Sequence, residues 1–302
     1  MQTERPSPRY STIDLWQPAE ILDAMIEGQF AAVAAVHAAR PALDRAAAAI
    51  EERLSAGGRL VYAGAGTSGR LAVQDGAELM PTFGWPAERL VLLMAGGDEA
   101  LLRAVEGAED DAEEAEALVR RHAIGESDVL IAVAASGTTP FTLSCLRAAG
   151  AAGALTVAIA NNRGAPLLDE AAPPILLDTG AEPIAGSTRM KAGTAQRAAL
   201  TVLSSLVMIR LGRVYQGLMV DVQATNEKLA RRSERILQQL TGHSREEARA
   251  ALRAARGSVK TALLLLEGYD PAEAKAALAA ASGNLRAAKD LAGKPDRKRK
   301  RA

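Results

Sequence analysis

Residues 57–70 read GGRLVYAGAGTSGR, an apolar run followed by a glycine-rich turn that carries two hydroxyl side chains. The run at 60–63 is short and rich in β-forming residues, which predicts a strand. The turn from Gly64 to Gly69 leads into a helical stretch. The N–H groups at the start of such a helix are free to face an anion. This stretch therefore predicts a strand–turn–helix unit that can bind a phosphate.

Four more short apolar runs follow along the chain, at 90–93, 129–133, 155–159 and 175–177. Helical stretches lie between most of them. Apolar strands separated by helices predict a parallel sheet covered on both faces, in an α/β fold. Upstream, residues 18–56 have a helical pattern that Gly57 and Gly58 end. Downstream, we expect a long helix from Thr188 or Met190 and another over 224–242.

The composition limits the class of protein. The chain has 302 residues, which fits one medium α/β domain and a smaller appendage. Lys+Arg and Asp+Glu both count 36, so no net charge attracts nucleic acid or a membrane. No apolar run looks long enough to span a bilayer, and the single cysteine, Cys145, excludes an internal disulfide. We expect a soluble, cytoplasmic protein.

The pattern predicts five parts: an N-terminal arm and helices (1–49), the α/β domain (50–213), a connecting helix (214–241), a small helical bundle (242–292) and a disordered basic tail (293–302). The bundle prediction rests on three or four short helical stretches separated by glycine and proline. The tail, KPDRKRKRA, has nothing to bury. A solvated tail is favoured over a nucleic-acid-binding one because nothing upstream supports a nucleic-acid surface.

The first candidate binding residues are Gly66, Thr67 and Ser68, in the turn after the first strand. The turn formally matches the dinucleotide fingerprint GxGxxG, a weak signal when it stands alone. A nicotinamide site also needs an acidic residue at the end of the next strand, and residues 90–97, LVLLMAGG, supply none. The two hydroxyls favour a phosphate monoester instead.

A second loop, ASGTTP at 135–140, also follows a strand and precedes a helix. Its candidate binding residues are Ser136, Gly137, Thr138 and Thr139. One such loop is ordinary turn chemistry, but two at the carboxyl ends of parallel strands point into the crevice where α/β sheets bind ligands. The pair predicts hydroxyls and amides around a phosphorylated sugar.

A third segment, GSTRMKAGTAQ at 186–196, precedes the long helix. Ser187 or Thr188 either caps that helix or contacts a ligand, and the pattern does not separate the two. Arg189 and Lys191 place positive charge beside the helix start. We take Ser187 and Lys191 as further candidate substrate-binding residues.

Two glutamates are the candidate catalytic residues. Glu78 lies on the helix that the first turn opens, or at its end, and Glu109 lies at a predicted helix start. From spacing alone, solvent exposure explains each of them better than catalysis does. Two carboxyl groups in one crevice nevertheless suffice to remove one proton and donate another. No histidine lies near them or near Cys145, so no hydrolytic triad or metal site is indicated, and we expect no cofactor.

Four stretches together resemble one family: 57–84, 94–111, 186–196 and 218–229. The sequence resembles the N-acetylmuramic acid 6-phosphate etherases, which belong to the sugar isomerase (SIS) superfamily and are similar to the glucokinase regulatory proteins. The resemblance covers nearly the whole chain. It implies a homodimer with a flavodoxin-like SIS core and a ubiquitin-associated-like (UBA-like) bundle at the C-terminus.

The resemblance also implies a lyase that acts on a sugar phosphate. Glu78 matches the family's proton donor and Glu109 its second active-site acid. This chain departs from the family at two places: the second loop has Thr138 where members often have arginine, and Leu79-Met80 stands where a cysteine-proline is usual. A contact from arginine to substrate is therefore missing or comes from elsewhere.

The implied reaction suits the candidate residues. Opening the sugar to its aldehyde acidifies the C2 proton, so a carboxylate can remove it and D-lactate can leave from C3, after which water adds. We assign Glu109 as the base and Glu78 as the acid, and the reverse assignment stays open. The alternatives are a non-catalytic phosphosugar-binding regulator and an aldose–ketose phosphate isomerase, with a dinucleotide oxidoreductase a distant fourth.

Overall fold

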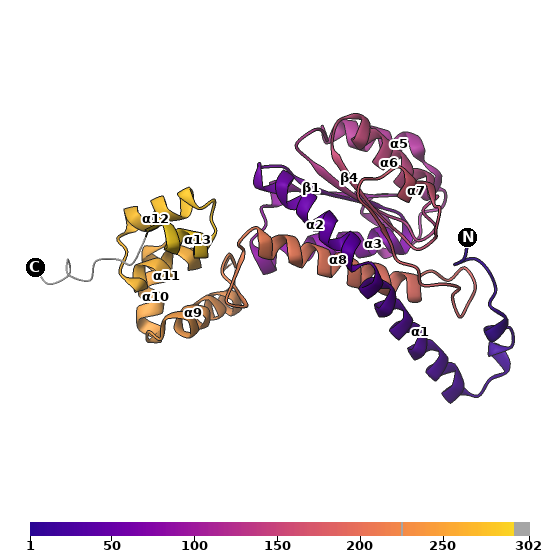
Figure 1. The fold of residues 1–302 in the computed structure, drawn as a ribbon, viewed down its shortest axis with the longest axis horizontal. Coiled ribbons are helices and arrows are strands. Elements are labelled where there is room, and N and C mark those ends of the chain that lie inside the picture. Colours follow the sequence, from indigo (N-terminus) through magenta and orange to yellow (C-terminus); the bar gives the residue numbers. More distant parts are fainter. Residues whose placement is uncertain (225, 293–302) are drawn as a thin grey trace, which may run out of the picture. The chain divides into compact units, whose positions relative to one another are not determined.

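The computed structural model describes residues 1–224 and 226–292, so the tail predicted for 293–302 lies outside the described residues. The chain forms two compact units (Figure 1). The first comprises Met1–Ala77 with Glu88–Ser205, and the second comprises Glu78–Ala87 with Leu206–Ala302. The first unit holds the parallel sheet and all three predicted loops.

The sheet has five parallel strands in the order β2-β1-β3-β4-β5. Their bounds are β1 Leu60–Gly64, β2 Leu90–Met94, β3 Val129–Val133, β4 Leu155–Ala160 and β5 Pro174–Leu176. All five predicted strands are therefore confirmed to within one residue at each end. This strand order is the flavodoxin-like one, in which the direction of winding reverses between β1 and β3. That reversal point is where such sheets bind ligands.

Helices cover both faces of the sheet, as predicted (Figure 1). On one face lie α5 (Ala112–Arg121), α6 (Pro140–Ala151) and α7 (Pro166–Asp169); on the other lie α2 (Arg40–Ser55), α3 (Gly66–Phe83) and α8 (Lys191–Arg210). Successive side chains of a strand point to opposite faces of the sheet, so alternate residues pack against the helices on each face. Val61 and Ala63 join the core under α5 and α6. Tyr62, between them, faces α3, where it meets Asp75.

The helical stretch predicted for 18–56 is two helices, α1 (Pro18–Ala38) and α2, with a break at Ala39 before Pro41. The short elements between β2 and α5 are α4 (Glu99–Leu102) and η4 (Ala108–Asp110), and η3 (Ala87–Arg89) precedes β2. The long helix predicted from Thr188 or Met190 begins at Lys191.

Two helices, α1 and α8, are long and apolar enough by length and composition to cross a membrane. The expectation that no run reaches this length is therefore wrong. In α8 more than half of the most apolar window is buried, so its composition is that of a core helix; the same window of α1 is 28% buried.

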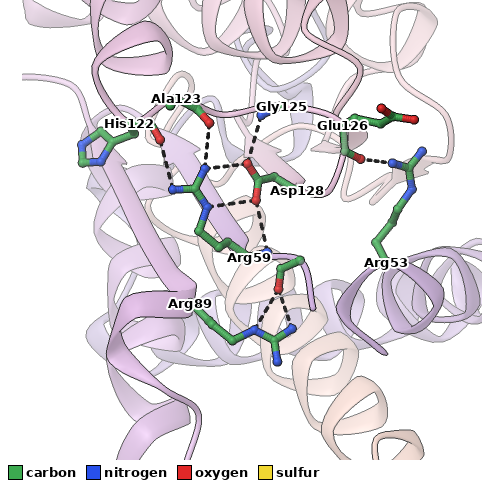
Figure 2. Close-up of polar contacts among 9 residues, drawn as sticks. Arg53, Arg59, Arg89, His122, Ala123, Gly125, Glu126 and Asp128 are labelled. Atoms are coloured by element: carbon green, nitrogen blue, oxygen red, sulfur yellow. Dashed lines mark hydrogen bonds and ion pairs between the residues drawn. The ribbon is translucent and has the colours of Figure 1, made fainter. Parts of the chain in front are cut away.

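An ion pair between half-buried Arg59 and buried Asp128 joins β1 and β3 at their amino ends (Figure 2). The guanidinium of Arg59 donates to both carboxylate oxygens of Asp128, with distances of 3.0 Å from Nε to Oδ1 and 2.7 Å from Nη2 to Oδ2. The same guanidinium donates to the carbonyls of His122 and Ala123, and the N–H of Gly125 donates to Asp128. This arrangement ties the start of both strands to the loop that precedes β3.

A second buried carboxyl group fixes α3 to the sheet. Asp75 accepts hydrogen bonds from the hydroxyl of Tyr62 on β1 (2.8 Å) and from Ser204 on α8 (3.2 Å). Burial raises the pKa of Asp75, although these two hydrogen bonds act in the opposite direction. The helix that carries Glu78 is thus held to the sheet by one of its own polar residues.

The second unit contains a hairpin that the sequence pattern did not predict, β6 (Val214–Tyr215) with β7 (Leu218–Met219). Gln216 and Gly217, which join the strands, both have positive φ, as a tight hairpin turn requires. Five helices follow: α9 Glu227–Thr241, α10 Arg245–Ala254, α11 Val259–Glu267, α12 Pro271–Ala280 and α13 Leu285–Ala292. Their apolar residues form a core of their own with the hairpin.

Candidate active site

The two predicted phosphate loops are neighbours at the carboxyl edge of the sheet. Gly64, the last residue of β1, pairs with Val133, the last residue of β3. The first loop leaves β1 and the second leaves β3, so both border the point where the winding of the sheet reverses. The sequence prediction of two adjacent hydroxyl-bearing loops therefore agrees with the sheet order.

In the first loop the backbone approaches itself too closely for any side chain. A Cβ atom on Gly64 would lie 2.9 Å from the Cα of Gly69, and one on Gly69 would lie 2.6 Å from the carbonyl oxygen of Gly64. Helix α3 begins at Gly66, with Thr67 half-buried and Ser68 buried. The close turn thus places both hydroxyl residues in the first turn of α3, where N–H groups lack helical partners.

The second loop gathers three hydroxyls at the start of α6. The N–H of Thr138 donates to Ser136 Oγ at 3.1 Å, and Ser136 Oγ lies 3.4 Å from Thr139 Oγ1. Gly137 has a φ of +70°, and a Cβ there would lie 2.5 Å from the Cβ of Ala165. Only glycine fits this position, so the loop conformation is set by the sequence and by its packing against the segment after β4.

Helix α8 is capped by a residue that the sequence analysis did not consider. The fully buried carboxylate of Glu182 accepts the N–H of Lys191 at 3.0 Å and the N–H of Ala192 at 2.8 Å. The capping role considered for Ser187 or Thr188 is therefore filled by Glu182. An acid at this place also complements the positive end of the helix dipole.

Lys191, a predicted substrate-binding residue, faces inward. Its Nζ donates to the carbonyl of Thr179 at 2.9 Å, and burial lowers its pKa. A Cβ on Gly28 of α1 would lie 3.1 Å from two carbons of the Lys191 side chain. In this conformation buried Lys191 holds the third segment to α1 and to the loop after β5.

The third segment nevertheless lies beside the first loop. A Cβ on Gly193 would lie 3.6 Å from the methyl carbon of Thr67. Ser187 itself is half-buried, in the turn before α8. The structure thus brings the start of α8 and the start of α3 together, as the phosphate-site prediction requires.

The N-terminal arm, residues 1–5, joins the third segment to the second loop. Thr3 is fully buried, its N–H donates to Asn162 Oδ1 at 3.2 Å, and its carbonyl accepts the N–H of Gly186. Asn162 also donates to the carbonyl of Ala135 at 2.9 Å. The sequence pattern predicts an N-terminal arm and does not place it beside these loops.

Asn161 and Asn162 are site residues that the sequence analysis missed. Asn161 donates to the carbonyl of Leu177 and accepts from Gln196 of α8, both at 2.9 Å. A signal was available, because two adjacent amides directly follow the apolar strand LTVAIA at the same edge of the sheet. The pair links the loops after β3, β4 and β5.

A pocket of about 410 Å³ opens beside the second loop. Ser136, Thr138 and Asn162 line it, and so do Gln2, Arg5 and Arg163. Its volume is in the range of small-molecule sites. The second loop carries threonine where the resembling family often has arginine, yet two arginines from other segments reach this pocket.

Glu109 is exposed on η4, a single turn that precedes α5 and packs against α6. The segment leading to it, residues 95–107, is tied back to the first loop. Arg70 donates through Nε to the carbonyl of Ala100 at 2.8 Å, and the N–H of Ala95 donates to the carbonyl of Gly64. Glu109 thus follows a segment anchored on the phosphate loops and keeps its carboxyl group accessible.

Glu78 is exposed in the interior of α3, three residues beyond Asp75. It is the first residue of the second compact unit, whereas Glu109 belongs to the first unit. The pairing of the two carboxyl groups around one substrate therefore stays a prediction.

The remaining chemistry-bearing residues lie apart from these loops. His37 is on α1, His122 ends α5 and His243 follows α9. Cys145 is fully buried in α6, where burial raises its thiol pKa to about 12, so it is a core residue as predicted. Among residues 1–224 and 226–292, no group of three or more His, Cys, Asp and Glu side chains is arranged to hold a metal ion.

Parts of this chain are similar to known proteins. The family model for the glucokinase regulatory protein N-terminal SIS domain matches residues 43–150. A solved phosphoheptose isomerase from Francisella tularensis is 20% identical, with a TM-score of 0.49, over 64% of this chain and 100% of that one. Residues 43–150 are thus similar to an SIS domain, the class of domain that this family model describes.

Close relatives define the family. An N-acetylmuramic acid 6-phosphate etherase from Deinococcus radiodurans is 55% identical over 266 residues, which is 88% of this chain and 87% of the relative. Another from Geobacillus thermodenitrificans is 43% identical over 88% of this chain and 90% of its own length. This chain belongs to the N-acetylmuramic acid 6-phosphate etherase family.

Proposed function

We propose that this protein cleaves the D-lactyl ether of N-acetylmuramic acid 6-phosphate and releases D-lactate and N-acetylglucosamine 6-phosphate. The observation that carries the proposal is the 55% identity to an etherase over 88% of the chain. The geometry supports it because the loops after β1 and β3 gather hydroxyls and amides at one edge of the sheet. Such a cradle suits a phosphate monoester.

In this proposal the phosphate binds to the hydroxyls and amides of the first two loops: Gly66, Thr67, Ser68, Ser136, Gly137, Thr138 and Thr139. Ser187 borders the same site. The starts of α3 and α6 contribute positive potential from their helix dipoles. Holding the phosphate fixes the sugar, so that catalytic groups meet its reacting carbons in one orientation.

The chemistry then needs one base and one acid. Glu109 removes the C2 proton of the open-chain aldehyde, and the C3–O bond breaks as Glu78 protonates the departing lactyl oxygen. Water, activated by Glu78, adds at C3 of the unsaturated aldehyde and restores the proton at C2. Each proton transfer contributes on the order of 10²–10⁴ in rate.

The test is direct. Purified protein incubated with N-acetylmuramic acid 6-phosphate should release D-lactate in equal amount to N-acetylglucosamine 6-phosphate, measured with a coupled lactate assay. Unphosphorylated N-acetylmuramic acid is the control and should react far more slowly because it lacks the anchoring group. A folded protein that releases no lactate from the phosphorylated sugar would refute the proposal.

A second candidate is a phosphosugar-binding regulator without turnover, which the match to the glucokinase regulatory protein SIS domain favours. Such a protein would bind N-acetylglucosamine 6-phosphate and release no lactate. An aldose–ketose phosphate isomerase is the third candidate; it would interconvert hexose phosphates and likewise release no lactate. The same incubation separates the etherase from the other two candidates, and incubation with a hexose phosphate separates the isomerase, which converts it, from the regulator, which only binds it.

We further infer a cytoplasmic homodimer that buries one face of α1. Four exposed apolar side chains lie on this face at helical spacing: Leu22 (59% exposed), Ile26 (52%), Phe30 (71%) and Val33 (56%). A stripe of this kind on a protein surface is typical of an interface. A second copy of the chain is the occupant that the resemblance implies.

Replacing Ile26 and Phe30 with glutamate should convert the dimer to a monomer. Burying each of these side chains contributes about 1.5–3 kcal/mol to association, and the substitution removes them from both copies. The dissociation constant of the dimer should therefore rise at least about 100-fold. Light scattering coupled to gel filtration measures the mass. Ala31→Glu is the matched control because Ala31 is exposed on α1 but lies off the stripe. An unchanged mass for the double variant would contradict this interface.

A further inference from the structure

The pocket beside the second loop has a positive character that the proposed chemistry does not use. Its described lining includes two arginines, Arg5 and Arg163, and no acidic residue. The hydroxyl residues Ser136 and Thr138 face the same space. A pocket that combines hydroxyl donors with guanidinium groups suits an anionic group of a small molecule.

The two arginines differ in how they are held. Arg163 already forms an ion pair within the protein, because its Nε lies 2.9 Å from Asp178 Oδ2. Arg5 makes a backbone hydrogen bond from its N–H to the carbonyl of Gln2. Within the described ranges 1–224 and 226–292, no ion pair or hydrogen bond is recorded for the Arg5 guanidinium. Arg5 is therefore the cation of this pocket that is free to meet a ligand.

The backbone that carries Arg5 is fixed in place. Two residues earlier, Thr3 is fully buried and bonded to Asn162 and Gly186. The N–H of Gln2 also donates to Asn162 Oδ1, at 2.6 Å. Because these hydrogen bonds hold the backbone next to Arg5, placing the guanidinium at a ligand costs little ordering of the chain.

We propose that Arg5 binds an anionic group of the substrate in the pocket formed with Ser136 and Thr138. This inference rests on the proposed function, whose substrate carries two such groups, the 6-phosphate and the lactyl carboxylate. A guanidinium binds either one through charge-assisted hydrogen bonds. Arg5 is thus a specificity-determining residue contributed by the N-terminal arm.

The experiment compares Arg5→Ala, Arg5→Lys and wild type in lactate release. Arg5→Ala should raise KM about 10- to 100-fold with kcat changed less than about threefold, the effect of removing a charge-assisted hydrogen bond in the ground state and transition state alike. Arg5→Lys should restore part of the loss. Arg9→Ala is the matched control, because Arg9 lies on the same arm and pairs with Glu27 on the surface; its KM should stay within about twofold.

Two competing ligands identify the group that Arg5 contacts. N-acetylglucosamine 6-phosphate carries only the phosphate, and N-acetylmuramic acid carries only the carboxylate. If only N-acetylglucosamine 6-phosphate inhibits Arg5→Ala more weakly than wild type, Arg5 contacts the phosphate. If only N-acetylmuramic acid does so, Arg5 contacts the carboxylate. Either result supports the inference. If wild type is active and neither KM nor either inhibition constant moves more than twofold, the inference is wrong.

Failure of the proposed function would look different. Wild type would then release no lactate, whereas calorimetric binding of N-acetylglucosamine 6-phosphate to wild type and Arg5→Ala would still report on the pocket. Weaker binding to Arg5→Ala supports the role of Arg5 without turnover. Equal binding to both proteins, in that case, overturns it.

Discussion

Glu109→Gln should lower the rate of lactate release by at least 100-fold while the protein stays folded. Glutamine keeps the shape of the side chain but cannot accept a proton, so a base-catalysed step loses on the order of 10²–10⁴ in rate. Glu109 is exposed on η4, so the change should cost little stability. The loss should therefore fall on kcat, measured by the lactate assay with the phosphorylated substrate.

Asp110→Asn is the matched control. Asp110 lies on the same 3₁₀ turn and is also exposed, so removal of its charge alters the local field in a similar way. Its kcat should stay within a few-fold of wild type. A Glu109→Gln enzyme as active as Asp110→Asn would remove Glu109 from the mechanism.

Glu78→Gln should be comparably slow, and exchange at C2 separates the two roles. In D₂O, an enzyme that retains its base but lacks its acid should still incorporate deuterium at C2 of unreacted substrate. We expect such exchange in Glu78→Gln and not in Glu109→Gln. The opposite pattern would interchange the two assignments, and exchange in both variants would exclude each glutamate as the C2 base.

Arg59→Ala should destabilise the first unit by about 3 kcal/mol. It leaves Asp128, which is 4% exposed, with its charge and without the guanidinium that binds both of its oxygens (Figure 2). Loss of one partner of a buried pair costs about 3–5 kcal/mol. The lower end applies here because the Arg59 side chain is 30% exposed and backbone N–H groups of Gly125 and Arg59 still donate to Asp128. Urea denaturation followed by circular dichroism measures the loss.

Two variants make this result specific. Arg53→Ala removes one hydrogen bond, from a guanidinium to the carbonyl of Glu126, and should cost only about 1 kcal/mol (Figure 2). Arg59→Met combined with Asp128→Asn removes both charges of this pair, so no unpaired charge is left at position 128. The double variant should recover part of the stability that Arg59→Ala loses. If Arg59→Ala is no less stable than Arg53→Ala, the pair does not stabilise the fold.

The same pair predicts a dependence on pH. Burial alone would raise the pKa of Asp128, but hydrogen bonds from Arg59 and from the backbone outweigh it and hold the pKa below its ordinary 3.8. A lowered pKa in the folded state means that the contribution is present above the unfolded value and is lost as the pH falls through the folded one. The stability difference between wild type and Arg59→Ala should therefore shrink below about pH 4.

The sequence by itself determined the strands of the sheet and the two glycine- and hydroxyl-bearing loops at its carboxyl edge. Each of the five strands is a short apolar run, and helical stretches lie between most of them. In the first loop, glycine is required because the backbones of Gly64 and Gly69 lie against each other. In the second loop, Gly137 has a positive φ. These are local signals, because hydrophobic pattern and backbone conformation act over short separations along the chain. The family resemblance, carried by motifs in the same loops, added the candidate acids Glu78 and Glu109.

Only the tertiary structure decided how the loops are held. The bond from Thr3 to Asn162 spans 159 positions, and no periodicity along the chain marks either residue as its partner. Glu182 caps α8 in place of a nearby Ser or Thr because the path of the preceding loop brings its carboxylate to the N–H groups of Lys191 and Ala192. Contacts of this kind depend on which distant segments the packed sheet brings together. The sequence pattern therefore predicts which loops form the candidate site, and the tertiary structure shows which other residues hold those loops in place.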